Sequence, residues 1–363
     1  MMIPDAVMQI EAEAFAGCWS LSSVYLSDNS CLPRISYGAF SNCGLTSFRA
    51  PANVSTIAQG AFAGCRNMTS FTFAANSRLS GISAYMFDGC DSLQSITFES
   101  GSALTSIQAH GLEGMRALTS IDFGDANVTN IDNFAFRFCE SLTSIVIPEG
   151  VTSIGRFAFY YCDGLTDVTL PASLEHIGRF AFLGADHVNL YFASSTMPLD
   201  LDEDWDYGIR SYYLGVTDVS ETEEWKYATT SDGGIALLEY KGSATTLDLS
   251  GLNLGGSITN IGGRAFAFSS VESMILPNTL VTIQAEAFLH SALKSVTVPA
   301  SVEFIGREAF AYTPIEDLRF AADGKLTVIE ASAFEGTEAL KSVTLPASLK
   351  TLGRAAFQKS GIT

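Results

Sequence analysis

One pattern constrains the fold of this 363-residue chain more than any other: an aliphatic residue is followed five positions later by Phe, usually with Ala just before that Phe. The pattern occurs thirteen times, once with Leu112 in place of Phe, and successive copies of this position lie 22 to 25 residues apart, except for one step of 84 between Phe182 and Phe266. The thirteen pairs are Ile10 and Phe15, Ile35 and Phe40, Ile57 and Phe62, Ile82 and Phe87, Ile107 and Leu112, Ile131 and Phe136, Ile154 and Phe159, Ile177 and Phe182, Ile261 and Phe266, Ile283 and Phe288, Ile305 and Phe310, Ile329 and Phe334, and Leu352 and Phe357. One unit of this length cannot bury its own apolar face, so the repeat predicts a solenoid of stacked units.

A second element follows each Phe and predicts a β-strand. Clear copies run from Leu142 to Pro148, from Leu165 to Pro171, from Leu293 to Pro299 and from Leu340 to Pro346, with apolar residues at positions one, four and six. Strand alternation puts positions four and six on one face, and Pro then ends the strand. We expect a short helix or 3₁₀ turn at the Ala-Phe element. The predicted fold class is therefore an α/β repeat solenoid of about thirteen repeats, with a parallel β-sheet on one face and short helical or 3₁₀ turns.

The unit from Leu165 to Phe182 resembles the BspA-type leucine-rich repeat, whose pattern runs approximately L-x-x-V-x-L-P-x-S-V-x-x-I-G-x-x-A-F-x-x-C. The resemblance covers about residues 3–192 and 245–363. It implies a bacterial cell-surface or secreted protein that contacts extracellular, host or matrix proteins in an adhesin-like role. The start of the chain lacks a basic stretch followed by an apolar core, so no signal peptide is visible, and the chain stops partway through a unit. We expect a fragment of a longer protein.

The gap between Phe182 and Phe266 divides the chain into three expected segments. Residues 1–192 form a first repeat block, residues 193–224 an acidic, aromatic-containing connector, and residues 225–363 a second repeat block. Residues 225–240 predict two strands around an Asp-Gly-Gly turn. Because the end of a solenoid exposes its apolar ladders, we expect this hairpin to cap the second block.

Charge and hydropathy narrow the possible partners. The chain has 39 acidic and 20 basic residues, for a net charge of −19. Such a chain repels nucleic acid and anionic lipid, so we expect neither as a partner. No apolar run approaches the roughly 18 residues that span a bilayer, so we expect no membrane insertion of this fragment. Composition leaves the oligomeric state open.

The cysteines follow the repeat rather than any catalytic or metal-binding spacing. Cys18, Cys43, Cys65, Cys90, Cys139 and Cys162 each lie three residues after the repeat's Phe, and Met115 and Ala185 take that place in two other units. We predict a ladder of buried free thiols, with Cys31 outside it and exposed. The four histidines form no metal-ligand motif, and no nucleophile elbow is present. We therefore expect no enzyme, no cofactor and no metal site.

The acidic connector raises the question of calcium. Asp200, Asp202, Glu203, Asp204 and Asp206 form one cluster of oxygen donors. A calcium-binding loop starting at Asp200 needs Gly at its sixth position and Glu at its twelfth, where this chain has Trp205 and Ser211. A solvated acidic loop is favoured over a calcium site.

Function is expected on the outward face of the strands, at positions three and five of the second element. This face is rich in Ser and Thr. The candidate binding residues are Tyr25, Arg49, Asp122, Asp167, Asp317 and Arg319, and Trp205 in the connector marks a competing site. Simple solvation of the β face is an equally weighted alternative for any one position. The predicted function is a non-catalytic protein-binding module, and the alternative is a passive spacer that displays another domain.

Overall fold

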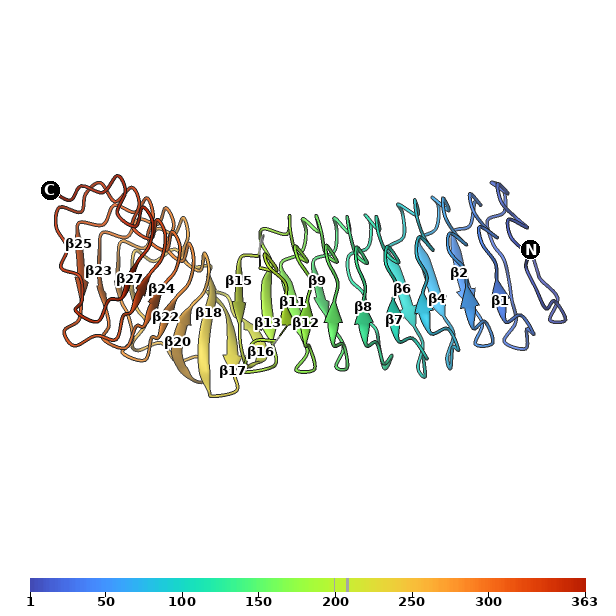
Figure 1. Cartoon of the computed structure of the whole chain (residues 1–363), viewed down its shortest axis with the longest axis horizontal. Helices are drawn as coiled ribbons and strands as arrows, with labels where there is room; N and C mark the ends of the chain where they lie inside the picture. Colours follow the sequence, from blue (N-terminus) through green and yellow to red (C-terminus); the bar gives the residue numbers. More distant parts are fainter. Residues whose placement is uncertain (199, 207–208) are drawn as a thin grey trace. The chain divides into compact units, whose positions relative to one another are not determined.

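The computed structural model describes residues 1–198, 200–206 and 209–363. The chain forms two compact units, Met1–Tyr212 (unit 1) and Tyr213–Thr363 (unit 2), each of which is considered by itself. Within each unit the chain winds into stacked turns, and corresponding strands of successive turns lie side by side (Figure 1). The stacking predicted from the repeat is confirmed.

The strands predicted after each Phe form the first series in unit 1. They are β2 (Ser47–Ala50), β4 (Ser70–Phe73), β6 (Ser95–Phe98), β9 (Ser144–Val146), β11 (Asp167–Leu170), β13 (Asn189–Phe192) and β15 (Ser211–Tyr213). Strands β2, β4 and β6 pair in parallel, as do β9, β11 and β13, and β15 lies beside β13. In β2 and β6 exposed and buried residues alternate, which fits the predicted parallel sheet with one face outward.

A second series of strands was not predicted from the sequence. In unit 1 the aliphatic residue of seven Ile-to-Phe pairs lies on a two-residue strand, whereas Ile10 of the first pair forms an isolated bridge to Ile35. The seven strands are β1 (Arg34–Ile35), β3 (Thr56–Ile57), β5 (Gly81–Ile82), β7 (Ser106–Ile107), β8 (Asn130–Ile131), β10 (Ser153–Ile154) and β12 (His176–Ile177), and β14 (Asp200–Leu201) follows them in the same series. These strands also pair in parallel between turns. Because β14 pairs with β12, the repeat stack continues into the predicted connector.

The prediction of helical or 3₁₀ turns is wrong. The described residues contain no helix, and hence none long and apolar enough to cross a membrane. Each Ala-Phe element is a run of turns in which the residues two before and two after the Phe have a left-handed backbone, such as Phe157 (φ 55°) and Tyr161 (φ 52°) around Phe159. A right-handed helix cannot pass through a left-handed residue, so the element stays a sharp corner.

Stacked phenylalanines fill the interior of each turn. In unit 1, the Phe159 ring lies 5.0 Å from that of Phe136 and 5.2 Å from that of Phe182, with ring planes within 7° of parallel. All three side chains are fully buried. Offset stacking of this kind adds about 0.5–1.5 kcal/mol per pair beyond the burial of apolar area.

Unit 2 repeats the same plan. Its first series comprises β19 (Thr246–Asp248), β21 (Ser273–Ile275), β23 (Ser295–Val298) and β25 (Asp317–Phe320). Its second sheet comprises β16 (Val216–Glu221), β17 (Trp225–Thr230), β18 (Gly234–Tyr240), β20 (Ser257–Ile261), β22 (Thr282–Ile283), β24 (Phe304–Ile305), β26 (Val328–Ile329) and β27 (Thr351–Leu352). Strands β16, β17 and β18 are antiparallel, whereas β18 pairs in parallel with β20.

The β17–β18 hairpin covers the first ring of the unit 2 ladder. The Trp225 and Tyr240 rings lie 6.0 Å and 5.6 Å from the Phe266 ring, and 4.8 Å from each other. Both side chains are nearly buried. Apolar area that the first turn would otherwise expose is thus removed from water. The segment boundaries expected at residues 192 and 224 stay a prediction.

Candidate functional site

The cysteines that follow the ladder Phe lie in a row from turn to turn, but Cys18 at the start of this row is not buried as the others are. Cys43, Cys65, Cys90, Cys139 and Cys162 are buried, whereas Cys18 and Cys31 are exposed. The prediction of a buried Cys18 is therefore wrong, because its turn is the first to carry this element and no earlier turn covers it. Each buried thiol donates to the main-chain oxygen of the ladder residue one turn earlier, over sulfur-to-oxygen distances of 3.0–3.3 Å. Burial raises the pKa of Cys43 to about 11, so it stays a poor nucleophile at neutral pH.

The acidic cluster of the connector is engaged with the turn before it. Asp200 accepts a hydrogen bond from His176 Nδ1 at 3.0 Å, and Asp202 accepts one from the Arg179 main-chain N–H at 3.0 Å. Asp204 pairs with the Arg179 guanidinium at 2.8 Å. Across residues 1–198, 200–206 and 209–363, no three His, Cys, Asp or Glu side chains converge as a metal site would require. Three of the carboxylates thus act locally, as links between turns.

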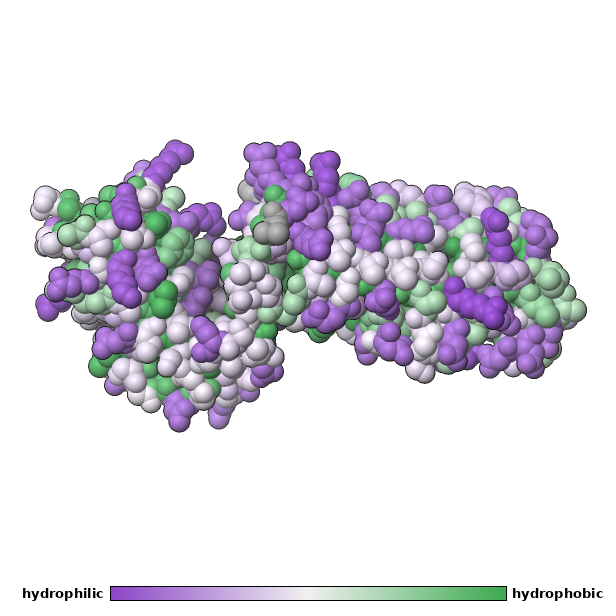
Figure 2. Space-filling view, turned by 60° about the horizontal axis from the view of Figure 1, so that its bottom comes forward, coloured by the Kyte–Doolittle hydropathy of each residue, from purple (hydrophilic) through white to green (hydrophobic). Residues whose placement is uncertain are grey.

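The predicted residues of unit 1 share the sheet face but do not form one cluster. Tyr25 is 58% exposed at a bridge to Met2, and Asp122 is exposed at a bridge to Thr97. Arg49 on β2 and Asp167 on β11 both lie on first-series strands. Strands β4 and β6 separate Arg49 from Asp122. Hydrophobic residues are scattered among hydrophilic ones on the faces turned to the viewer in Figure 2.

The two charged candidates Arg49 and Asp167 already have partners within the chain. Arg49 pairs with Asp28 at 2.5 Å and with Glu99 at 3.1 Å, and these hydrogen bonds raise the pKa of Arg49 and lower that of Glu99. The Asp167 carboxylate accepts a hydrogen bond from the Tyr191 hydroxyl at 2.7 Å. A partner that used either charge would first have to compete with these contacts.

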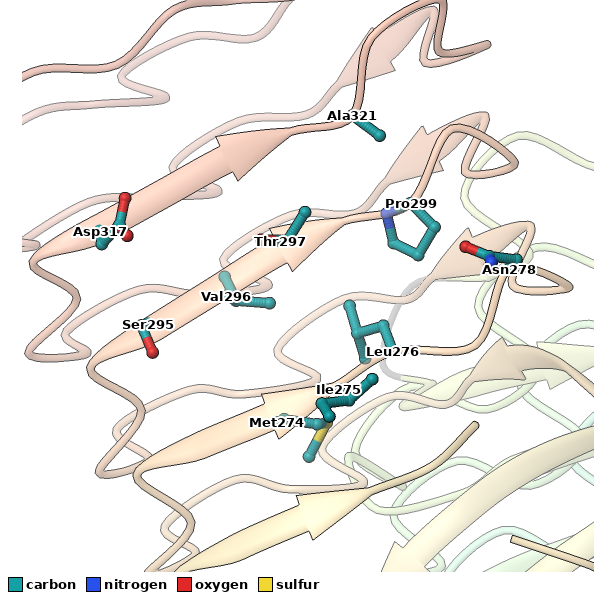
Figure 3. Close-up of a pocket in the computed structure, with 10 residues that line it drawn as sticks. All are labelled: Met274, Ile275, Leu276, Asn278, Ser295, Val296, Thr297, Pro299, Asp317 and Ala321. Carbon is teal, nitrogen blue, oxygen red and sulfur yellow. The ribbon is translucent and has the colours of Figure 1, made fainter. Parts of the chain in front are cut away.

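Unit 2 contains a hollow on its sheet face, which we call the sheet-face depression (Figure 3). It has a volume of about 360 Å³ and is lined by residues of β21, β23 and β25 and of the loops after them. Ile275 is 57% exposed in it, beside Thr297 of the next strand. The predicted residue Asp317 lines the depression and pairs with the predicted residue Arg319 at 2.8 Å. The exposed Ile275 therefore adds an apolar group to a lining that also includes Ser295, Thr297 and Asp317.

Trp205 belongs to a small aromatic cluster rather than to an open site. Its ring lies 5.9 Å from that of Tyr212 and 6.4 Å from that of Phe192. The side chain is half-buried, because it packs over the last strands of unit 1. The indole is thus used in part to cover apolar surface.

A larger aromatic cluster was missed from the sequence, and we call it the turn-face aromatic surface. It comprises Phe134, Phe138, Phe157, Tyr160, Tyr161 and Phe180. Five of these six are residues two before or two after a ladder Phe, and they have a left-handed backbone. Five of the six side chains are half-buried, and Tyr161 is 44% exposed. The signal that could have revealed the surface was the run of aromatic residues at these two positions in consecutive units.

Three arginines lie over this surface. The guanidinium of Arg137 is 4.5 Å from the Phe138 ring centroid, that of Arg179 is 4.6 Å from Phe180, and that of Arg156 is 5.6 Å from Phe157. Cation–π contacts at such distances contribute about 0.5–1 kcal/mol at exposed sites. Aromatic and arginine side chains together are the composition enriched at protein interfaces.

Several solved structures are similar to this chain. A leucine-rich cell-surface protein of Faecalibacterium prausnitzii is 25% identical over 86% of this chain and 85% of its own, with a TM-score of 0.41. A leucine-rich repeat protein of Bacteroides ovatus is 19% identical over 98% of this chain and 69% of its own, also with a TM-score of 0.41. The pneumococcal vaccine antigen PcpA is 16% identical over 97% and 78%, with a TM-score of 0.37. No curated protein matches the sequence.

The repeat itself identifies the family. The family described as BspA type leucine rich repeat region matches residues 1–101, 74–189 and 243–363, with six copies. These ranges contain all thirteen Ile-to-Phe pairs of the sequence and the stacked turns that they form. Since the TM-scores lie below 0.5, the family follows from the repeat match alone. The chain belongs to the BspA-type leucine-rich repeat family.

Proposed function

We propose that this chain is a non-catalytic protein-binding module of a bacterial cell-surface or secreted protein, with an adhesin-like role toward host or matrix proteins. The observation that carries the proposal is the sheet-face depression of unit 2, where Ile275 stays exposed on an otherwise polar sheet. Membership of a repeat family supports a binding role, because stacked repeats build extended surfaces. We further propose that segments 1–192, 193–224 and 225–363 act as block, connector and block.

The depression fits one apolar side chain of a protein partner. Ile275 supplies apolar contact, and removing its exposed area from water on binding is favourable. Thr297 and Asp317, which also line it, offer hydrogen-bonding groups that would orient the partner's main chain. The rigid parallel sheet below holds these groups in place before the partner arrives, which lowers the entropic cost of binding.

A passive spacer is the second candidate, and the internal ion pairs favour it. Arg49 and Arg319 are both neutralised by carboxylates of their own chain. Exposed charges that are already paired add little to the affinity for a partner. As a spacer, the chain would hold another domain away from the cell and bind nothing itself.

The deciding experiment measures binding of the folded chain to immobilised, purified extracellular-matrix proteins and host-surface glycoproteins. The test variant is Ile275→Asp, which places a charge in the lining of the depression. The matched control is Val281→Asp, since Val281 is a partly exposed aliphatic residue of unit 2 outside the depression. Saturable binding that is lost in the first variant and kept in the second supports the proposal. Equal binding by both variants would move the site elsewhere, and no binding to any protein would favour the spacer.

A further inference from the structure

We propose that the turn-face aromatic surface of unit 1 binds a protein segment that offers one carboxylate flanked by apolar side chains. The surface is separate from the sheet-face depression, so this inference does not rest on the function proposed above. Its elements are the aromatic residues at left-handed positions, with their rings in contact, and the guanidinium of Arg156.

The backbone places these aromatic residues at the corners of successive turns. Phe138 and Tyr161 have φ values of 60° and 52°, in a region that costs a residue with a side chain about 1–2 kcal/mol. The neighbouring turns place Gly114 and Gly184 at the same position. Other turns have non-glycine residues at this position too, such as Asn42, His290 and Lys359, so the left-handed backbone belongs to the corner of the repeat and glycine is compatible with it.

The rings of this surface contact one another from turn to turn. The Phe157 ring lies 5.3 Å from that of Phe134 and 5.6 Å from that of Phe180, along the direction in which the turns stack. The Phe134 and Phe157 rings are stacked within 9° of parallel, whereas the Phe157 and Phe180 rings are tilted by 36°. Ring edges carry the positive part of the aromatic quadrupole, so they favour an approaching anion.

Charge pairing singles out Arg156 among the three arginines. Arg137 pairs with Glu113 at 3.3 Å, and Arg179 pairs with Asp204 at 2.8 Å. Arg156 is exposed between them and makes no ion pair with any residue that the structure describes. A guanidinium that rests on a ring still has its N–H edge free to bind a carboxylate with two hydrogen bonds.

The net charge of the chain limits the partner to a single anchoring carboxylate. At −19, the chain repels a polyanion such as nucleic acid or a run of acidic residues. Apolar side chains on either side of the carboxylate would instead pack on the rings of Phe134 and Tyr161. An acidic residue within an apolar protein segment satisfies both conditions.

The experiment selects a phage-displayed library of random linear peptides on the full chain, and then measures binding of a synthetic peptide from the enriched set. We expect the enriched peptides to share one Asp or Glu between apolar residues. Arg156→Glu should weaken binding at least roughly tenfold, as expected when a charge-assisted hydrogen bond is lost. Arg66→Glu is the matched control, because Arg66 is exposed in unit 1 outside this surface, and it should leave affinity unchanged.

A second variant removes rings without endangering the fold. Phe138→Gly combined with Tyr161→Gly introduces the residue that the neighbouring turns already have, and it should weaken binding several-fold while thermal unfolding stays cooperative. Enriched peptides without a shared carboxylate, no enrichment at all, or equal effects of Arg156→Glu and Arg66→Glu would each overturn the proposal. Sedimentation measurements complete the test. Self-association of the native chain that disappears in Arg156→Glu would assign the surface to a second copy, against the partner proposed.

Discussion

The phenylalanine ladder of unit 2 allows a quantitative test of how stacking stabilises this fold. Phe310 is fully buried, and its ring lies 4.9 Å from that of Phe288 and 5.1 Å from that of Phe334. Phe357 is only partly buried and has one stacked neighbour, Phe334, at 5.0 Å. The two residues have the same chemistry and the same position in the repeat. They differ in burial and in having two stacked neighbours or one.

The expected difference follows from these contacts. Truncating a buried Phe to Ala costs about 3–5 kcal/mol, and Phe310→Ala should lie at the upper end because two stacked pairs are lost. Phe357→Ala loses one stacked pair, worth about 1 kcal/mol. Because Phe357 is only partly buried, it also loses roughly half of the free energy that a fully buried Phe gains by leaving water. We therefore expect Phe310→Ala to lower the free energy of unfolding by about 2 kcal/mol more than Phe357→Ala.

Urea unfolding followed by circular dichroism measures both changes within the same unit. Hydrogen–deuterium exchange of the flanking turns should show where protection is lost, since each turn contacts only its neighbours. Phe310→Leu is a suitable control, because Leu112 already occupies this ladder position in unit 1 and a Leu should lose less than an Ala. Equal costs for the two Ala variants would refute the view that ring stacking between turns stabilises the interior.

Three further predictions concern the backbone corners and the thiols. Ala355 has a left-handed backbone (φ 59°), so Ala355→Gly should raise the free energy of unfolding by up to about 1 kcal/mol in urea titrations, and a loss would contradict the assigned conformation. Alkylation of the native chain should modify Cys18 and Cys31 quickly and the five buried thiols only after unfolding, which peptide mass mapping can check. Because burial raises the pKa of Cys43 from 9.0 to about 11, its neutral form favours the folded state, and that stability is lost as pH rises from 9 to 11. The difference in unfolding free energy between the native chain and Cys43→Ala should change over that range, and a constant difference would argue against a buried, protonated thiol.

The stacking and the long strands were predictable because they depend on side chains that repeat. The alternation from Ser95 to Phe98 shows directly which residues face inward. The short strands were missed because two residues, such as Ser153 and Ile154, leave no alternation to detect. The helical turns were predicted wrongly because Phe157 gives no local sign of its left-handed backbone, which the neighbouring turns impose.

The candidate surfaces also differ in how far they could be predicted from the sequence. The exposure of Asp317 and Arg319 was predictable from strand position alone, but their mutual ion pair depends on side-chain geometry. The sheet-face depression depends on the relative heights of side chains on three strands, which no local pattern records. The turn-face aromatic surface depends on residues such as Phe134 that vary between units and acquire meaning only when the turns are stacked.

The direction of the hydrogen bonds between turns has a mechanical consequence. Both strand series pair only with the turns before and after them, so these bonds run along the stacking direction of each unit. If the two ends of a unit were pulled apart, the hydrogen bonds between one pair of turns would break at a time. The bonds of a whole sheet would not have to break together. We expect such a unit to lengthen stepwise at low force. Each turn that detaches adds unfolded chain length, which lowers the tension on the turns that remain stacked.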